Sequence, residues 1–138
     1  MKSRQTGFTM IELIVVIVIL GILAATALPK FIDMRGDAQG AALSGVVGAA
    51  AAAVNLNYGG CSINNNVALA NKCVKVSNCT DVASLLQGGA MPANYTITAA
   101  ALGTGAAGSN GVTANCTVTL AGYATTQTFL GVSAGNGP

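Results

Sequence analysis

The longest apolar stretch of the chain lies close to its N-terminus. From Phe8 to Leu28 the only charged residue is Glu12. As a helix, this stretch would be about 31 Å long at ~1.5 Å per residue, which matches a bilayer core of about 30 Å. Lys2 and Arg4 precede it, and positive charge just before an apolar span keeps that end in the cytoplasm. We therefore predict a single helix across the inner membrane, with the rest of the chain outside.

A helical pattern continues from Lys30 to about Asn57. Its apolar residues recur every three or four positions in two stripes, which is the spacing of helix faces. One stripe comprises Phe31, Met34, Ala38, Ala42, Val46, Ala49, Ala53 and Leu56, and the other comprises Leu43, Val47, Ala50 and Val54. A helix with two apolar faces needs two partner surfaces, namely the chain's own sheet and neighbouring subunits. Gly59 and Gly60 are predicted to end this helix.

The remainder of the chain reads as loops, a short helix and short strands. The short helix starts at Thr80 or Asp81 and runs through Gln87, with Gly88 as its stop. Alternating or β-branched residues predict strands at 95–98, 113–120 and 125–132. Asn110-Gly111 predicts a hairpin turn, and the glycine-rich tail 131–138 is expected to fray. The predicted fold is α+β, with a long N-terminal helix packed on a small antiparallel sheet.

Composition argues against catalysis. The chain has no His, which removes the commonest general base and metal ligand. Its four carboxylates belong to Glu12, Asp33, Asp37 and Asp81. The six basic residues include Lys2 and Arg4, so the chain beyond the N-terminus is neutral and shows no basic surface for nucleic acid. We expect that the chain is not an enzyme and that it binds no metal and no cofactor.

Four cysteines lie on the predicted outer side of the membrane, where disulfides persist. They are Cys61, Cys73, Cys79 and Cys116. Three pairings are open. We favour Cys61–Cys73, which closes a loop, together with Cys79–Cys116, which ties the short helix to a central strand. A zinc tetrathiolate is disfavoured because no two cysteines have the C-x₂₋₄-C spacing.

Glu12 separates three interpretations of the N-terminus. An ordinary secretory signal with a cleavage site near Ala24–Ala27 leaves Glu12 unexplained, and so does a plain membrane anchor. An ionisable residue inside a membrane helix costs roughly 2.5–3.5 kcal/mol and is by default a functional residue. A glutamate that snorkels near the helix end is the simpler alternative.

The N-terminal motif resembles the type IV pilin family. The residues that carry this resemblance are Gly7-Phe8-Thr9-Met10-Ile11-Glu12-Leu13, the apolar run from Ile14 to Leu28, and Pro29. A finer likeness, to the mannose-sensitive haemagglutinin type of pilin, is carried by Phe31-Ile32-Asp33-Met34 and Asp37-Ala38. The family also implies disulfides in the C-terminal part, without fixing their pairing.

The resemblance implies a maturation step and an assembly residue. Residues 1–7 would be a leader that a prepilin peptidase and N-methyltransferase removes between Gly7 and Phe8, methylating the new Phe8 amine. Residues 8–29 would span the membrane and later form the fibre core. Residues 30–138 would form a globular head with a helix at 30–57, a loop and short helix at 58–90, and the sheet at 91–138.

The function implied is that of a structural subunit of a type IV pilus. The inner-membrane assembly machinery would draw the subunit into a homo-oligomeric helical fibre on the cell surface, serving adhesion, motility or DNA uptake. A pseudopilin of a type II secretion system shares the motif and is the alternative. A membrane-anchored binding or enzymatic domain that never polymerises is a third class, and Glu12 argues against it.

Three further residues have expected roles in assembly. The Phe8 amine created by cleavage is the natural partner of Glu12, either in the same subunit or in a neighbour. Pro29 removes a backbone donor and favours a kink, and Gly21 is a second weak point of the helix. We expect the stretch between Gly21 and Pro29 to lose helical hydrogen bonds in a fibre; a simple bend at the membrane surface is the alternative.

Overall fold

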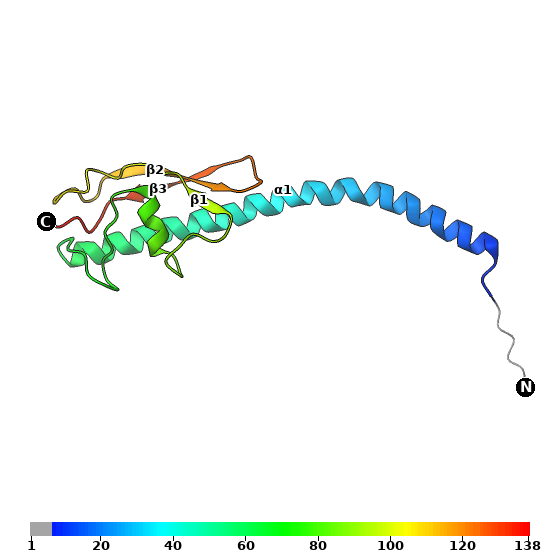
Figure 1. Ribbon diagram of the computed structural model, residues 1–138, viewed down its shortest axis with the longest axis horizontal. Helices are drawn as coiled ribbons and strands as arrows, with labels where there is room; N and C mark the ends of the chain where they lie inside the picture. The colour runs from blue at the N-terminus through cyan, green and yellow to red at the C-terminus, as the bar shows by residue number, and fades with distance from the viewer. Residues whose placement is uncertain (1–6) are drawn as a thin grey trace, which may run out of the picture. The chain divides into compact units, whose positions relative to one another are not determined.

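One helix, α1, runs from Met10 to Ile63 (Figure 1). The computed structural model describes residues 7–138, apart from the side chains of residues 28–33. Contacts divide the chain into two units, Met1–Ala38 and Gln39–Pro138. After α1 come a 3₁₀ helix, η1 (Cys79–Leu85), and three strands, β1 (Tyr95–Ile97), β2 (Thr113–Leu120) and β3 (Gln127–Val132). Residues 1–6, which belong to the predicted leader 1–7, lie outside the described part of the chain.

The first part of α1 is apolar and buries nothing. Every side chain from Gly7 to Ala27 is exposed. Met10–Ala27 has a mean hydropathy of 2.7 and is long enough to cross a membrane. Met34–Ile63 also passes this test of length and composition, with a mean hydropathy of 1.3. Because part of that second segment packs in the core of the Gln39–Pro138 unit, the first segment is the one that fits a bilayer.

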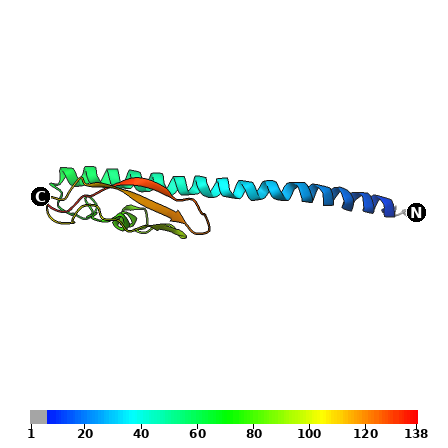
Figure 2. The ribbon, with the colours of Figure 1, turned by 90° about the horizontal axis from the view of Figure 1, so that it is seen from above.

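Within the Gln39–Pro138 unit, α1 lies along one face of the sheet (Figure 2). Leu43, Ala50 and Val54 of α1 are buried in the same cluster as Val118 and Phe129 of the sheet. These helix residues belong to the second of the two predicted stripes. From the first stripe, the side chains of Met34 and Leu56 stay exposed by 59% and 78%. The predicted α+β architecture is confirmed, and the first stripe leaves large apolar side chains exposed at Met34 and Leu56.

The predicted end of α1 at Asn57 is wrong, because the helix continues through Gly59 and Gly60 to Ile63. Gly60 contacts the Lys72 carbonyl oxygen so closely that a Cβ would collide with it. Gly60 therefore serves a close approach of two chain segments instead of a helix stop. The helix ends where Asn65 and Asn66 adopt the left-handed φ values of 53° and 56°.

The three strands form an antiparallel sheet in the order β1-β2-β3. β2 has its predicted bounds, while β1 and β3 are shorter than predicted. The predicted hairpin turn at Asn110-Gly111 is wrong, since β2 and β3 are joined by residues 121–126. The Gly111 N–H donates to the Ser133 carbonyl, so this dipeptide binds the chain's last residues instead of turning a hairpin.

η1 is capped differently from the prediction. Asn78 is its N-cap, and its side chain accepts a hydrogen bond from the Thr80 N–H. The Asp81 carboxylate accepts hydrogen bonds from the backbone N–H groups of Ser77 and Asn78, each at 2.9 Å. The predicted cap at Thr80 or Asp81 was therefore placed too late, because Asp81 supplies the second half of a capping box that Asn78 opens. The helix also ends at Leu85, before the predicted Gln87.

The tail that was predicted to fray is buried. Ser133, Ala134 and Asn136 are all less than one-tenth exposed. Ala134 and Val76 exchange both of their backbone hydrogen bonds, and the Gly137 N–H donates to the Asn66 carbonyl. Glycine-rich composition favoured flexibility, but here glycines at φ of 70° and 82° (Gly135 and Gly137) let the backbone pair with its surroundings.

The tight packing around Gly131 gives a test of this fold. A Cβ at Gly131 would meet the Cys116 Sγ at 2.6 Å and two Leu102 methyl groups at 3.1 Å. We expect Gly131→Ala to lower the free energy of unfolding by about 1–3 kcal/mol through overpacking. Gly45→Ala is the control, because nothing lies within 4 Å of its Cβ position, and it should stabilise α1 by about 0.5–1 kcal/mol. Urea titration of the oxidised full-length chain in detergent measures both, and equal effects of the two variants would contradict the packing described.

Candidate functional site

The N-terminal motif lies where extended chain enters α1. Gly7, Phe8 and Thr9 precede the helix, and all three are exposed. The Phe8 side chain is 83% exposed. The peptide bond between Gly7 and Phe8 is therefore in non-helical backbone, and both of its residues are exposed within the described part of the chain. A peptidase can reach such a bond without first unwinding the helix.

Glu12 is held by the residue that caps the helix. The Thr9 carbonyl accepts the first intrahelical hydrogen bond, from the Leu13 N–H at 3.2 Å. The Glu12 Oε2 accepts from the Thr9 N–H at 2.8 Å and from the Thr9 hydroxyl at 2.7 Å. In return, the Glu12 N–H donates to the Thr9 Oγ1 at 3.4 Å. Thr9 and Glu12 thus form a capping box, the reciprocal arrangement that a Thr and a Glu three residues apart make at a helix start.

The sequence interpretation missed this capping box. Its signal was present as Thr9-Met10-Ile11-Glu12, which has the spacing T-x-x-E. The sequence interpretation considers the Phe8 amine as the partner of Glu12, in the same subunit or in a neighbour, and does not consider Thr9. The structure shows that Thr9 is a partner of Glu12. Only Oε2 of the Glu12 carboxylate accepts hydrogen bonds from described residues, and Oε1 accepts none from them.

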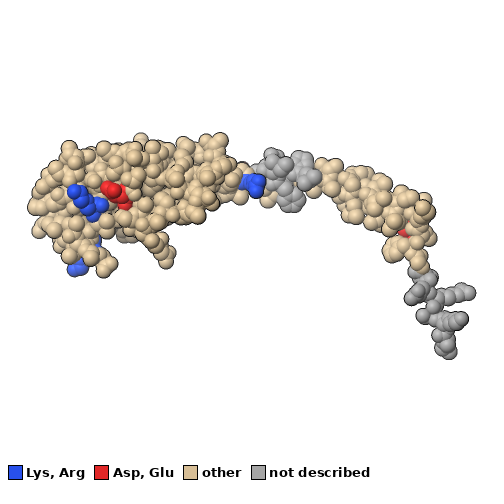
Figure 3. Space-filling model, viewed as in Figure 1, with Lys and Arg blue, Asp and Glu red and all other residues tan. Residues whose placement is uncertain are grey.

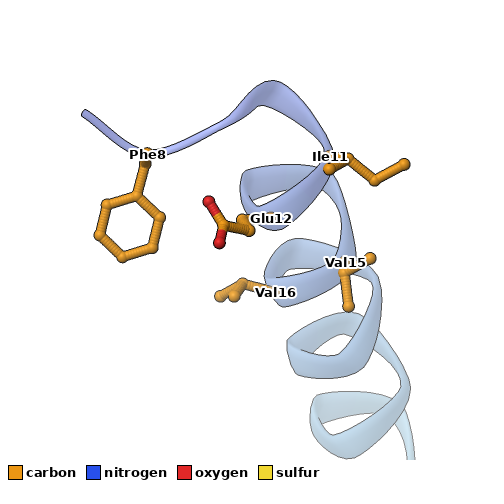
Figure 4. Close-up of a pocket in the computed structure, with 5 residues that line it drawn as sticks. All are labelled: Phe8, Ile11, Glu12, Val15 and Val16. Atoms are coloured by element: carbon orange, nitrogen blue, oxygen red, sulfur yellow. The ribbon is translucent and has the colours of Figure 1, made fainter. Parts of the chain in front are cut away.

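The surroundings of Glu12 are otherwise apolar. A shallow hollow of about 320 Å³ is lined by Phe8, Ile11, Glu12, Val15 and Val16. Figure 4 shows the Glu12 carboxylate directed to the side of the helix on which Phe8 and Val16 lie. A carboxylate in an apolar hollow is costly unless it is paired, so this hollow suits a cationic group attached to an apolar side chain.

Gly21 and Pro29 both fall within the continuous helix α1. Gly21 is exposed, and nothing lies within 4 Å of its Cβ position, so no contact within the described chain requires a glycine there. The side chain of Pro29 lies outside the described residues. The expected loss of helical hydrogen bonds between these residues concerns a fibre, and it stays a prediction.

The other described carboxylates are structural or solvated. Asp81 is occupied by the capping box of η1, and Asp37 is exposed. Among the described residues, no three His, Cys, Asp or Glu side chains gather as a metal site would require. Charged side chains of either sign are few on the face drawn in Figure 3.

All four cysteines are paired, in the pattern favoured from the sequence. Cys61 is joined to Cys73 and Cys79 to Cys116. The first bridge ties the last turn of α1 to the following loop and packs against Ala134 of the tail. The second connects η1 to the middle of β2, inside the main core. Each bridge typically contributes about 2–4 kcal/mol of stability, which matters in a chain with few aromatic residues.

Comparisons with known proteins give matches over part of the chain. The model of the family described as "Prokaryotic N-terminal methylation motif" matches residues 2–28. The chain is 51% identical over 55 residues to the type IV narrow pilus major component PilA5 of Thermus thermophilus, which covers 40% of this chain and 44% of that protein. It is 49% identical over 53 residues to the type IV major alpha-pilin of Moraxella bovis, covering 38% of this chain and 33% of the relative.

A third relative is the type IV major fimbrial protein FimA of Dichelobacter nodosus, 54% identical over 41 residues, or 30% of this chain and 26% of the relative. The matched region spans less than half the length of each of these curated relatives. No solved structure matches the chain. All three relatives are named as pilus or fimbrial components, which is a structural and not an enzymatic role.

Residues 2–28 carry the N-terminal methylation motif, and part of the chain is similar to type IV pilus and fimbrial components.

The capping box predicts a specific role for Thr9. Thr9→Val keeps the β-branched shape but removes the hydroxyl that binds Glu12, so the first turn of α1 should lose about 0.5–2 kcal/mol of stability. Hydrogen exchange at Met10–Leu13 of the full-length chain in detergent measures this loss. Thr26→Val is the control, because the Thr26 hydroxyl donates only to the carbonyls of Ile22 and Leu23 within the helix. Unchanged protection in Thr9→Val, or an equal loss at Met10–Leu13 in Thr26→Val, would contradict the capping role.

Proposed function

We propose that the chain is a structural subunit of a type IV pilus that is stored in the inner membrane and polymerised into a surface fibre. The observation that carries this proposal is Glu12, the one charged residue on a helix segment that is apolar and exposed from Gly7 to Ala27. The partial match to pilins and fimbrial proteins supports it. The segment requires an apolar environment, and Glu12 requires a partner in it.

The exposed apolar segment has two environments in this proposal. Large aliphatic side chains such as Leu13, Ile17 and Leu20 are each more than half exposed, and a soluble protein does not keep such a continuous patch in water. Before assembly, lipid covers the patch, with the N-terminus on the cytoplasmic side because Lys2 and Arg4 precede the span. After assembly, the same segments of neighbouring subunits cover it.

Maturation supplies the partner of Glu12. Cleavage between Gly7 and Phe8, by a prepilin peptidase that also methylates the new terminus, places an ammonium group one residue before Thr9. The capping box uses only Oε2 of Glu12 in the described hydrogen bonds, so the second carboxylate oxygen can receive the ammonium group of an adjacent subunit. A buried pair of this kind specifies the axial register between subunits.

The exposed stripe of α1 supplies a second contact between subunits. Met34 and Leu56, both from the first predicted stripe, are exposed on α1. A contact between this stripe and the apolar helix of a neighbour joins two different surfaces, and such a head-to-tail contact propagates without closing. The assembly machinery of the inner membrane would deliver subunits to this growing end.

The pseudopilin of a type II secretion system remains the alternative, since its subunits share the N-terminal motif. The relatives reported above are named pilus or fimbrial components, which favours the pilus. The occupation of Asp81 by a helix cap leaves no acidic loop around it for calcium. Adhesion, motility and DNA uptake are the roles that a pilus would serve.

Replacing Glu12 tests the proposal. Glu12→Ala removes an intramembrane charge, so membrane insertion and cleavage after Gly7 should persist. Fibre assembly should fall at least tenfold, because a buried ammonium left without its partner costs about 3–5 kcal/mol per subunit. Immunoblots of membrane and sheared-fibre fractions separate the two pools.

Val18→Ala is the matched control, because it shortens a side chain of the same exposed apolar segment that does not line the hollow around Glu12. It should assemble nearly as the wild type does. Co-expression of Glu12→Ala with wild-type chains should restore some incorporation if the partner comes from a neighbour. Normal fibre yield from a pure Glu12→Ala population would contradict the charge pair and leave apolar packing alone to explain assembly.

A further inference from the structure

β3 is an edge strand that lacks the usual protection against pairing with another strand. The sheet order β1-β2-β3 leaves one side of β3 without a neighbouring strand (Figure 1). Protein edges are commonly protected by lysine, proline, a bulge or a covering element. β3 contains no charged residue and no proline, and it pairs with β2 residue by residue from Gln127 to Val132, so no bulge interrupts it. After Asp81 the chain has no Asp, Glu, Lys or Arg at all.

The opposite edge of the sheet is less suited to pairing. β1 has only three residues, Tyr95–Ile97, and it contacts η1. Side chains of both elements, among them Ala83 of η1 and Ile97 of β1, line one hollow. The edge at β1 is therefore short and lies beside a helix, whereas β3 offers a longer edge.

The register of the sheet shows which backbone groups of β3 point away from β2. The Ser133 N–H donates to the Val112 carbonyl at 2.9 Å. In an antiparallel pair, residues that bond to the partner strand alternate with residues that do not. The odd-numbered residues of β3 therefore bond to β2, and the N–H and C=O groups of Thr128, Leu130 and Val132 point outward from the sheet edge. Outside the sheet, no hydrogen bond among the described residues uses these groups.

The same three residues share the outer face of the sheet. Phe129 is buried in the core with α1, and side chains alternate between the faces along a strand. Thr128, Leu130 and Val132 therefore lie on the opposite face, with Thr117 of β2 directly beside Thr128. Leu130 is 55% exposed, and it is the one large exposed apolar residue within the described strands.

We propose that β3 pairs with β3 of a second copy of this chain, antiparallel and about a two-fold axis at Leu130. A row of N–H and C=O groups at strand spacing is complementary to the edge of another strand. The outward residues are centred on Leu130, so this register places Leu130 opposite Leu130 and Thr128 opposite Val132 of the second copy. Each of these pairs can exchange both of its hydrogen bonds. No other antiparallel register of the edge with itself pairs all three outward residues.

Two features favour a second copy over water or an unrelated peptide. The two Leu130 side chains become directly opposed cross-strand neighbours, which removes from water apolar surface that is exposed in the single chain. Like charges opposite each other would disfavour the pairing, and neither copy carries a charge after Asp81. The contact is isologous and closes on itself, unlike a head-to-tail contact that propagates. The inference therefore goes beyond the proposed function and does not depend on it.

Cysteine cross-linking of the full-length chain in detergent tests the register. All four native cysteines are paired, so an added cysteine is the one free thiol. Leu130→Cys places two thiols opposite each other, on Cα atoms ~5.5 Å apart, which is within the range of a disulfide. Thr128→Cys is the matched control on the same exposed edge, because its two copies would lie ~14 Å apart at ~3.4 Å per residue. Under mild oxidation we expect at least about fivefold more covalent dimer from Leu130→Cys.

Two further measurements test the backbone hydrogen bonds. Thr128→Pro, added to Leu130→Cys, removes an outward N–H and leaves the bonds between β2 and β3 intact. The dimer yield should fall about tenfold, because each dimer loses two hydrogen bonds. In the wild-type chain, amide hydrogen exchange at Leu130 should slow as the protein concentration rises, whereas exchange at Phe129, which already bonds to β2, should not change.

The outcomes separate a specific pair from chance encounters. Equal dimer yields from Leu130→Cys and Thr128→Cys would indicate random collisions within a micelle and would overturn the proposal. Exchange at the Leu130 amide that does not depend on protein concentration would overturn it as well, because water alone would then cover the edge. An undiminished dimer yield in the Thr128→Pro variant would have the same consequence. Preferential dimer formation by Leu130→Cys supports the proposal whether or not the chain forms fibres.

Discussion

A single carboxylate in an apolar helix constrains the rest of this protein. Glu12 cannot lie in a bilayer or a fibre core without a hydrogen-bonding partner, and the chain provides a first one in Thr9. The capping box holds the carboxylate at the very start of α1, within hydrogen-bond distance of the Thr9 N–H and hydroxyl. Because the position of Glu12 is set by the helix start, the depth of the carboxylate and the depth of the Phe8 amine are coupled. This coupling is what allows one subunit's terminus to meet another subunit's glutamate in our proposal.

The Gln39–Pro138 unit is stabilised by backbone contacts as much as by large side chains. Its main core is built from small residues such as Ala50, Val54 and Cys116, with Phe129 as the one buried phenylalanine among the described residues. Glycines bring segments close together, as at Gly131 beside Cys116. The two disulfides and the paired tail add the constraints that a core without bulky side chains needs. A neutral, threonine-lined sheet face is left on the outside.

Local signals predicted the elements whose own pattern decides their structure. β2 was predicted to the residue because strict alternation specifies a half-buried strand. The end of α1 was predicted wrongly because Gly60 does not stop the helix. It allows the close approach of the Lys72 carbonyl, and no local sequence pattern reveals that contact. The tail was missed because Ala134 gains its order from Val76, far away in sequence. The Thr9–Glu12 capping box was recognisable in the sequence from its T-x-x-E spacing, but the Phe8 amine was assigned as the partner of Glu12 instead.

The position of the Phe8 amine in an assembled fibre tests the central claim most directly. Electron cryo-microscopy of sheared fibres, at a resolution that shows side chains, would locate this amine and the Glu12 carboxylate of every neighbour. The account predicts that each subunit starts at Phe8, and that its amine lies within about 4 Å of a Glu12 oxygen on an adjacent subunit. Fibres in which every Glu12 contacts only its own Thr9, or in which the subunit retains residues before Phe8, would contradict it.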